Sequence, residues 1–208
     1  MSELHGCQLC PRLSSYRSQQ KRKYPNYHCL PVAGFGAENA RLLIVGLAPG
    51  LHGANATGRP FSGDASGDLL FACLHKFGFA TRSTSRLPDD SMQLKNCRIT
   101  NAVKCVPPGN KPVADEINTC NQFLQQEISG MGSGCVLLAL GTIAHRAVLK
   151  AMDLSQSQFR FHRFAEHDLP GGLKLIDSYH PSLYNQNTGK ITPEILENVF
   201  DRVSKVLR

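Results

Sequence analysis

Four short apolar segments alternate with helical patterns along this chain, and this alternation restricts its fold more than any other feature. The apolar segments are residues 41–47, 97–103, 135–140 and 173–178. Apolar residues recur at helical spacing in the patterns that begin at Leu69, Ile117, Ile143 and Ile195, the last of them after Thr192, a suitable N-cap. Alternating strands and helices favour a parallel sheet that is covered on both faces. We therefore predict an α/β fold, a three-layer α/β/α sandwich with a central, mainly parallel four-stranded sheet.

Length and composition indicate a globular protein. The chain has 208 residues, of which 41% are hydrophobic and 19% are charged, enough for one sizeable core, so we expect a single domain over residues 1–208. No apolar run approaches the length of a membrane span, and the first residues lack the basic start and apolar core of a secretion signal. We expect a monomer with no membrane association and a cytoplasmic location. The polar segment 81–95 is expected to be an exposed, mobile connection.

The positive charge of the chain indicates a polyanionic partner, with nucleic acid as the first candidate. The net charge is +7 at neutral pH. Basic residues form one cluster at Arg17 and 21–23 and another at Arg202, Lys205 and Arg208, as in a surface patch that neutralises phosphates. Charge alone favours equally a solvated basic surface that keeps the protein soluble.

A glycine-rich loop over residues 46–64 follows the first apolar segment, where open parallel sheets bind their ligands. The loop lacks the Gly-Lys-Ser/Thr of a nucleotide P-loop and the glycine spacing of a dinucleotide site. We predict that it is an active-site loop. Within it, Phe61 is expected to offer an exposed ring for stacking on a flat base, and the alternative is that this ring anchors the loop.

Three polar side chains lie at ends of predicted strands that should share one rim: Asp64, Asn101 and His180. A carboxylate can orient or deprotonate water, an amide can pair with a base edge, and an imidazole can donate to a growing negative charge. Each also has an ordinary structural alternative. Asp64 can cap the helix near Ser66, Asn101 can cap a turn, and His180 can bond to a buried carbonyl. We predict that the three converge around one pocket.

Eight cysteines divide by their context into core residues and candidate ligands. Cys73, Cys97 and Cys135 lie in apolar patterns and are expected in the core, whereas Cys29 is ambiguous. The remaining four form two pairs, Cys7 with Cys10 in Cys-x-x-Cys, and Cys105 with Cys120 across a Pro-rich turn. Four thiolates from two segments can hold tetrahedral zinc or an iron-sulfur cluster. Spacing alone leaves zinc, a cluster and no metal equally open.

Together these motifs resemble the uracil-DNA glycosylase superfamily, and most closely its type B (family 5) members. The resemblance covers nearly the whole chain and rests on the order and number of the motifs. They are Cys7-x-x-Cys10-Pro-Arg-Leu, Pro31-Val-Ala-Gly-Phe-Gly36, the loop 46–64 continuing through Ser66-Gly67-Asp68, Thr100-Asn101-Ala-Val-Lys-Cys105-Val-Pro-Pro108, Cys120, and His180-Pro-Ser182 followed by Asn185 and Thr188-Gly189.

The resemblance implies a role for each of these motifs. It makes Cys7, Cys10, Cys105 and Cys120 the ligands of a structural 4Fe-4S cluster, which would tie the segment 1–36 to the domain. It assigns Asp64 to the attacking water, Asn101 and His180 to the base, and Phe61 to stacking on the flipped base. Leu47 stands where related glycosylases carry an acidic or polar residue, which separates type B from type A. The chain departs from the family loop at Gly50 and Ala56.

The expected contacts with the substrate follow from these motifs. We expect base contacts from the glycine-rich loop and the third motif, namely Gly46, Ala48, Pro49, His52, Gly53, Asn55, Phe61 and Ser182. After Ser182 an apolar tip precedes polar residues and a lysine, a sequence suited to wedging into a duplex and holding phosphates. We expect DNA contacts from Arg59, Tyr184, Asn185 and Lys190.

We predict a monofunctional DNA glycosylase of base excision repair. It would hydrolyse the N-glycosidic bond of uracil, and of other deaminated bases such as hypoxanthine and xanthine, in single- or double-stranded DNA, leaving an abasic site. One alternative is a type A enzyme restricted to uracil. A second is a non-catalytic iron-sulfur module that binds nucleic acid or senses oxidation, and a third is a hydrolase of free nucleosides.

Overall fold

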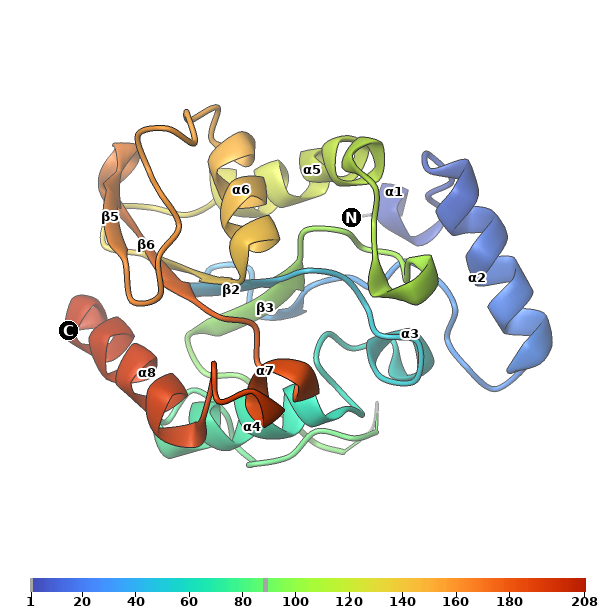
Figure 1. The fold of residues 1–208 in the computed structure, drawn as a ribbon, viewed down its shortest axis with the longest axis horizontal. Helices are drawn as coiled ribbons and strands as arrows, with labels where there is room; N and C mark the ends of the chain where they lie inside the picture. The colour runs from blue at the N-terminus through green and yellow to red at the C-terminus, as the bar shows by residue number, and fades with distance from the viewer. Residues whose placement is uncertain (1, 88–89) are drawn as a thin grey trace.

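A six-stranded sheet forms the centre of the computed structural model, which describes residues 2–87 and 90–208 (Figure 1). The strands lie in the order β1-β3-β2-β4-β6-β5. Their bounds are β1 (Phe35–Gly36), β2 (Leu42–Gly46), β3 (Cys97–Asn101), β4 (Val136–Leu140), β5 (Glu166–Leu169) and β6 (Leu173–Ser178). The four predicted strands correspond to β2, β3, β4 and β6, and they pair in parallel. The predicted α/β class is confirmed.

The prediction of four strands omitted the two edges of the sheet. β1 pairs antiparallel with β3, and β5 pairs antiparallel with β6. β1 has only two residues, too few to show a periodic pattern. β5 has the sequence Glu-His-Asp-Leu and is partly exposed, so it carries no apolar run. Short, charged edge strands discourage pairing with another chain.

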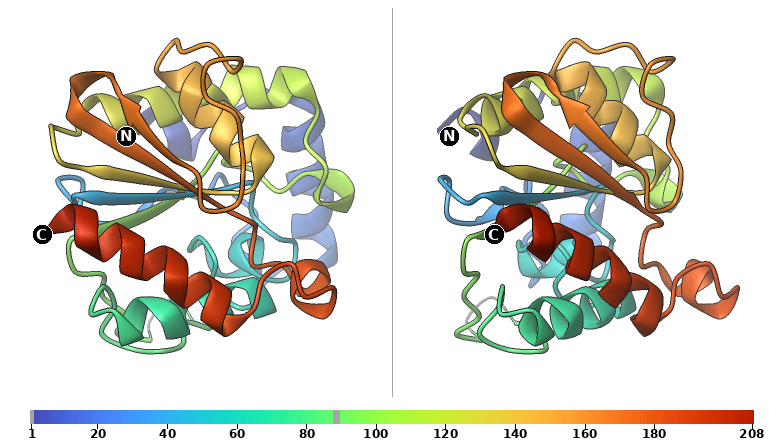
Figure 2. Two further views of the ribbon diagram at one scale, coloured as in Figure 1. Left: turned by 60° about the vertical axis from the view of Figure 1, so that its left-hand side comes forward. Right: turned by 90° about the vertical axis from the view of Figure 1, so that its left-hand side faces the viewer.

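Helices cover both faces of the sheet, and the three predicted layers are present (Figures 1 and 2). α5 and α6 pack together on one face, and α4 and α8 pack together on the other. The helices are α1 (Ser2–His5), α2 (Pro11–Lys23), α3 (Ala54–Thr57), α4 (Ala65–Lys76), α5 (Ala114–Ser129), α6 (Thr142–Ala151), α7 (Leu183–Asn187) and α8 (Pro193–Leu207), with 3-10 turns η1 (Pro108–Asn110) and η2 (Pro170–Gly172).

The side chains of β2 show why the central strands are apolar throughout. Leu42 and Ile44 pack toward α4 and α8, whereas Leu43 and Val45 pack toward α5 and α6. All four are at most 2% exposed. A strand that is buried on both faces needs apolar residues at every position. At the other end of the chain Thr192 caps α8, as predicted, because its side chain accepts a hydrogen bond from the Ile195 amide.

The amino-terminal helices lie beside α5, at the side of the sandwich (Figure 1). The Arg12 guanidinium donates to both carboxylate oxygens of Glu116 on α5, each at 2.7 Å. Leu13 packs with Val103 and Phe123 in a small apolar cluster. An ion pair and apolar contacts therefore join α2 to the main core.

Most of the described residues of segment 81–95 are exposed, as expected, but two of them are buried. Ser85 is 2% exposed and Met92 is 4% exposed. The Ser85 carbonyl accepts a hydrogen bond from the Gly63 amide, which joins this segment to the glycine-rich loop. Residues 88 and 89 lie outside the described residues. Across 2–87 and 90–208, no helix combines the length and apolar character that crossing a membrane requires.

Gly67 in the first turn of α4 allows the helix to approach the glycine-rich loop. A Cβ atom at this position would lie 1.6 Å from the Phe61 carbonyl oxygen. We expect Gly67→Ala to lower the free energy of unfolding by at least about 1–3 kcal/mol, because the backbone at Phe61 must shift to admit the added Cβ atom. The matched control is Gly130→Ala, where nothing lies within 4 Å of an added Cβ. Chemical denaturation should separate the two variants, and equal stability would contradict this close approach.

Candidate active site

A pocket of about 310 Å³ opens at the carboxyl edge of the sheet. Asp64, Asn101 and His180 all line it. The register explains part of this arrangement, since Gly46 at the end of β2 pairs with Asn101 at the end of β3. His180 follows the end of the parallel strand β6 by two residues. The structure therefore brings the three predicted polar groups around one pocket.

Asp64 serves as a helix cap and also lines the pocket. Its side chain caps α4 by accepting a hydrogen bond from the Gly67 amide at 2.9 Å. Its other oxygen lies close to the loop backbone, because a Cβ atom at Gly53 would be 2.5 Å away. Burial raises the pKa of Asp64, although amide bonds from Gly67 and Ser66 oppose this change. Asp64 is therefore both the N-cap of α4 and a residue that lines the pocket.

His180 and Phe61 form a stacked pair at the pocket. Their ring centroids are 5.5 Å apart with an interplanar angle of 27°. Burial lowers the pKa of His180 to about 4, so its imidazole is neutral at neutral pH. Phe61 was expected to be exposed but is only 5% exposed, and it belongs to the main apolar core. Its ring therefore anchors the loop and also lines the pocket.

Gly46 provides the space in which Phe61 and Asn101 meet. A Cβ atom at Gly46 would lie 2.5 Å from Asn101 Oδ1 and 2.6 Å from the Phe61 ring. Asn101 itself is 3% exposed. The Asn101 amide is thus held against the backbone and faces the pocket from β3. Any larger residue at position 46 would displace the ring or the amide.

The other expected base contacts are placed unevenly. Ala48 and Ser182 line the pocket, whereas Pro49, His52 and Asn55 do not. His52 lies apart in an aromatic cluster, where its Nδ1 is 3.0 Å from the Tyr27 hydroxyl. Asn55 is fully buried in α3 and donates to the Leu51 carbonyl. Base contacts from Pro49, His52 and Asn55 stay predictions.

Two polar lining residues are absent from the predicted contacts, Ser66 and Asn110. Asn110 ends η1 and is exposed at the pocket, with a left-handed φ of 57°. The signal for it was the Pro-Pro-Gly-Asn turn that follows Cys105, which we assigned only to the connection between two cysteines. Ser66 lies in the first turn of α4, the helix that Asp64 caps.

The expected DNA contacts lie in different surroundings. Tyr184 on α7 is 68% exposed, and the Lys190 ammonium lies 5.6 Å from the centroid of its ring. Asn185 instead donates to the His180 carbonyl at 2.8 Å, which holds the loop after β6. The Arg59 side chain is 11% exposed and forms an ion pair with Asp90. Contact between Arg59 and a DNA phosphate stays a prediction.

Cys7, Cys10, Cys105 and Cys120 line one cavity between α2 and α5. Burial raises the pKa of Cys105 to about 12 and that of Cys120 to about 11. Thiols that are so strongly protonated become thiolates when a metal binds them. The donor set of four sulfur atoms fits a zinc ion or an iron-sulfur cluster.

Polar groups around this cavity suit bound thiolates. The Lys104 amide donates to Cys120 Sγ at 3.2 Å. Arg17 also lines the cavity, and its Nε is a buried nitrogen without a hydrogen-bond partner among the described residues. Both groups favour negative charge on the sulfur atoms. The other cysteines lie as predicted, since Cys73, Cys97 and Cys135 are buried in the apolar cores, and Cys29 is buried as well.

Comparison with known proteins is consistent with this geometry. The sequence model of the family described as the uracil DNA glycosylase superfamily matches residues 33–204. The chain is 42% identical to a type-5 uracil-DNA glycosylase of Thermus thermophilus, over 95% of this chain and 92% of that protein. It is 40% identical to a type-5 uracil-DNA glycosylase of Pyrobaculum aerophilum, over 98% and 90%. A type-4 uracil-DNA glycosylase of Thermotoga maritima is 31% identical over 81% and 79%.

The raised pKa of Asp64 means that its negative charge destabilises the folded protein above that pKa. We expect Asp64→Asn to raise the melting temperature at neutral pH, because asparagine is also a good N-cap and carries no charge. The gain should vanish below about pH 4, where wild-type Asp64 is protonated. Asp68→Asn is the control, since Asp68 pairs with Arg86 and is 40% exposed. A lower melting temperature for Asp64→Asn would contradict the assignment of a destabilising charge.

Proposed function

This chain belongs to the uracil DNA glycosylase superfamily, and we propose that it hydrolyses the N-glycosidic bond of uracil in DNA. The observation that carries the proposal is the meeting of Asp64, Asn101 and His180 around one pocket. Its volume of about 310 Å³ is near the lower end of the usual range for ligand pockets, about 300–1,000 Å³. A single base with its sugar suits this size better than a large cofactor.

The base must leave the duplex to reach the pocket. Flipping costs a few kcal/mol and is easiest for a mispaired base such as uracil opposite guanine. The Phe61 ring, which lines the pocket, offers a flat surface for one face of the base. Asn101 offers both an amide donor and a carbonyl acceptor for the edge of the base. Tyr184 and the neighbouring exposed Leu183 form the apolar tip that would fill the space left in the duplex.

Negative charge develops on the departing base while the sugar becomes electron-poor. A neutral His180 can donate a hydrogen bond to this charge without carrying a full positive charge of its own. Asp64 holds a water molecule toward the sugar carbon and accepts its proton. Its carboxylate is kept in place by the cap to α4. The products are the free base and an abasic site.

The proposed reaction stops at the abasic site. Cleavage of the strand by a glycosylase requires an amine that forms a Schiff base with the sugar. None of the described residues that line the pocket is a lysine. The buried Lys104 is engaged elsewhere, since its ammonium pairs with Glu127 at 2.7 Å.

We propose that the pocket also accepts hypoxanthine and xanthine. Leu47 lines the pocket with an apolar side chain. It offers no polar group whose loss of a partner would penalise a purine. An enzyme restricted to uracil is the alternative, and comparison of the three bases distinguishes them. A cytoplasmic location and a monomeric state also stay predictions.

We propose a 4Fe-4S cluster for the four cysteines that line the cavity beside α2. When bound, the cluster would supply a structural cross-link between the amino-terminal segment and the turn after β3. The support is the shared cavity and the amide and guanidinium groups around it. The pocket that Asp64 lines is separate from the cysteine cavity and shares no lining residue with it. The cysteines therefore take no part in bond cleavage.

Labelled oligonucleotides bearing uracil, hypoxanthine or xanthine, treated with alkali after incubation, test the proposed reaction. We expect strand breaks at each base with wild-type protein. Asp64→Asn should reduce turnover on uracil by about 10²–10⁴-fold while DNA binding changes little. Asp68→Asn, on the same helix, should match wild type. DNA binding without release of any base would favour the non-catalytic module, and release from free nucleosides alone would favour the nucleoside hydrolase.

Metal analysis of protein purified without oxygen tests the proposed cluster. We expect about four iron atoms and about four sulfides per chain. Cys120→Ser should lose this iron, and proteolysis should then cut the amino-terminal segment faster. Cys73→Ala, which changes a buried cysteine on α4, should keep the iron. Zinc in place of iron, or full iron content in Cys120→Ser, would contradict the proposal.

A further inference from the structure

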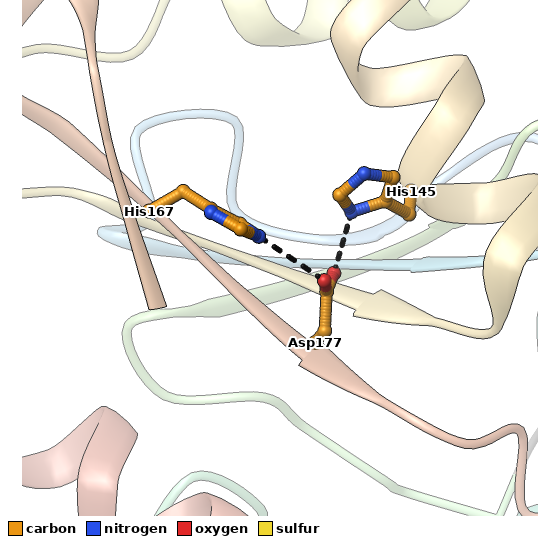
Figure 3. Close-up of side chains that lie close together, drawn as sticks. All are labelled: His145, His167 and Asp177. Atoms are coloured by element: carbon orange, nitrogen blue, oxygen red, sulfur yellow. Dashed lines mark hydrogen bonds and ion pairs between the residues drawn. The ribbon is translucent and has the colours of Figure 1, made fainter. Parts of the chain in front are cut away.

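Three side chains converge behind the pocket, on the α6 face of the sheet (Figure 3). His145 comes from α6, Asp177 from β6 and His167 from β5. His145 Nδ1 lies 2.7 Å from Asp177 Oδ1, and His167 Nε2 lies 3.3 Å from Asp177 Oδ2. Asp177 is fully buried, and the His145 side chain is 2% exposed. None of the three lines the proposed active site.

The hydrogen-bond partners of His145 determine how many protons its imidazole ring carries. Its Nε2 lies 2.9 Å from the Phe159 carbonyl oxygen, which can only accept a hydrogen bond. Its Nδ1 faces a carboxylate oxygen of Asp177. A neutral imidazole has one N–H and can donate to one of these two oxygens, whereas an imidazolium donates to both. Because both ring nitrogens face acceptor oxygens, the pair of His145 and Asp177 must hold one more proton than a neutral histidine and an ionised aspartate together.

The electrostatic surroundings agree with this count. Burial by itself lowers the pKa of His145, but the hydrogen bond and the charge of Asp177 outweigh it, and the Phe159 carbonyl adds to them. The net effect is a raised pKa. Three groups from the sheet side face His145: Asp177 on β6, His167 on β5 and the Phe161 ring before β5. Arg146 on α6 adds a positive charge that opposes protonation. The helix α5 contacts α6 through the neutral side chain of Asn121.

A metal ion would compete for the same three side chains. Their ligand atoms all lie within 4.8 Å of one another, close enough for one ion. Two ligand atoms on tetrahedral zinc lie about 3.3 Å apart, given zinc–ligand bonds of about 2.0–2.2 Å. The 2.7 Å between His145 and Asp177 is shorter and matches a charge-assisted hydrogen bond. The distance favours a proton over a metal between these atoms.

The pair joins two segments that border His180. Asp177 precedes His180 by three residues on the same strand end. On the other side, the His145 amide bonds to the Gly141 carbonyl, and the Gly141 amide bonds to the Ser178 carbonyl at 2.8 Å. Gly141 also faces His180, since an added Cβ would lie 3.6 Å from the His180 Cβ. The first turn of α6 and the end of β6 thus hold each other beside the pocket.

We propose that His145 is a positively charged positioning residue, which through its buried pair with Asp177 holds the end of β6 and so aims His180 at the base. The positioning role rests on the proposed glycosylase function, whereas the charge of His145 does not. The pair makes no contact with substrate. It acts by restricting where His180 lies.

The charge is tested without any substrate. In nitrogen NMR of the histidine rings, both nitrogens of His145 should carry protons at neutral pH, and they should titrate above the ordinary histidine range near pH 6.5. A His145 ring with one bare nitrogen at neutral pH would overturn the proposal. Zinc added in equal amount should leave the His145 signals unchanged. Stoichiometric binding of zinc at His145 and His167 would equally overturn it.

Stability against pH provides an independent measurement. A raised pKa in the folded state stabilises the fold fully below the ordinary histidine value, and this stabilisation is lost as pH rises through the raised value. We expect the unfolding midpoint of His145→Gln to lie below that of wild type at pH values under the ordinary histidine pKa of about 6.5, and the gap to narrow as pH rises above it. His162→Gln, an exposed histidine before β5, is the control and should show a constant gap. A gap that does not depend on pH contradicts the charged pair.

Turnover tests the positioning role. We expect His145→Gln and Asp177→Asn to lower kcat on uracil DNA by about 10–100-fold with little change in KM, since small displacements of an aligned group cost this much. The activity of wild type should also fall at high pH as His145 loses its proton, and His145→Gln should lack this decline. A variant with unchanged kcat would overturn the positioning role. If wild type releases no uracil, the proposed function fails while the NMR and stability tests still decide the charge.

Discussion

Parallel pairing of the central strands is the constraint on which the rest of the site depends. Because β2, β3, β4 and β6 run in the same direction, their carboxyl ends meet at one edge of the sheet. Asn101 ends β3 opposite the end of β2, and His180 follows the end of β6. Asp64 reaches the same edge through the loop after β2. Groups that are more than a hundred residues apart thereby share one pocket.

Close backbone contact makes the shared pocket possible. Gly46, Gly53 and Gly67 each lie where a Cβ atom would collide with the Phe61 segment or with Asp64. In this loop glycine therefore serves to admit neighbouring atoms at short distance. The result is a ring that is buried in the core yet still lines the pocket. The side chains of the candidate site pack directly on backbone, which has little room to move.

Burial changes the acid and the imidazole of the pocket in opposite directions, and both changes favour the uncharged form. It raises the pKa of Asp64 and lowers that of His180. A neutral hydrogen-bond donor and a carboxylate that readily takes a proton suit the proposed reaction, in which charge appears only in the transition state. Behind the pocket, the buried carboxylate of Asp177 outweighs burial and raises the pKa of His145. The pKa values of two histidines at one end of the sheet thus shift in opposite directions, because burial dominates at His180 and the Asp177 carboxylate dominates at His145.

Sequence alone determined the central strands, the main helices and the positions of the polar groups at the strand ends, because these depend on local periodicity. β2 shows this, since burial on both faces requires an unbroken apolar run. Tertiary structure alone decided the two edge strands, whose short or polar sequences leave no periodic signal. It also decided that Phe61 is buried and that Asp64 caps α4 while lining the pocket. His145 and Asp177 are 32 positions apart, and the sequence around either residue gives no indication that the two are in contact. Contacts of this kind arise only when the sheet and its helices bring distant segments together, whereas periodicity is set by neighbours along the chain.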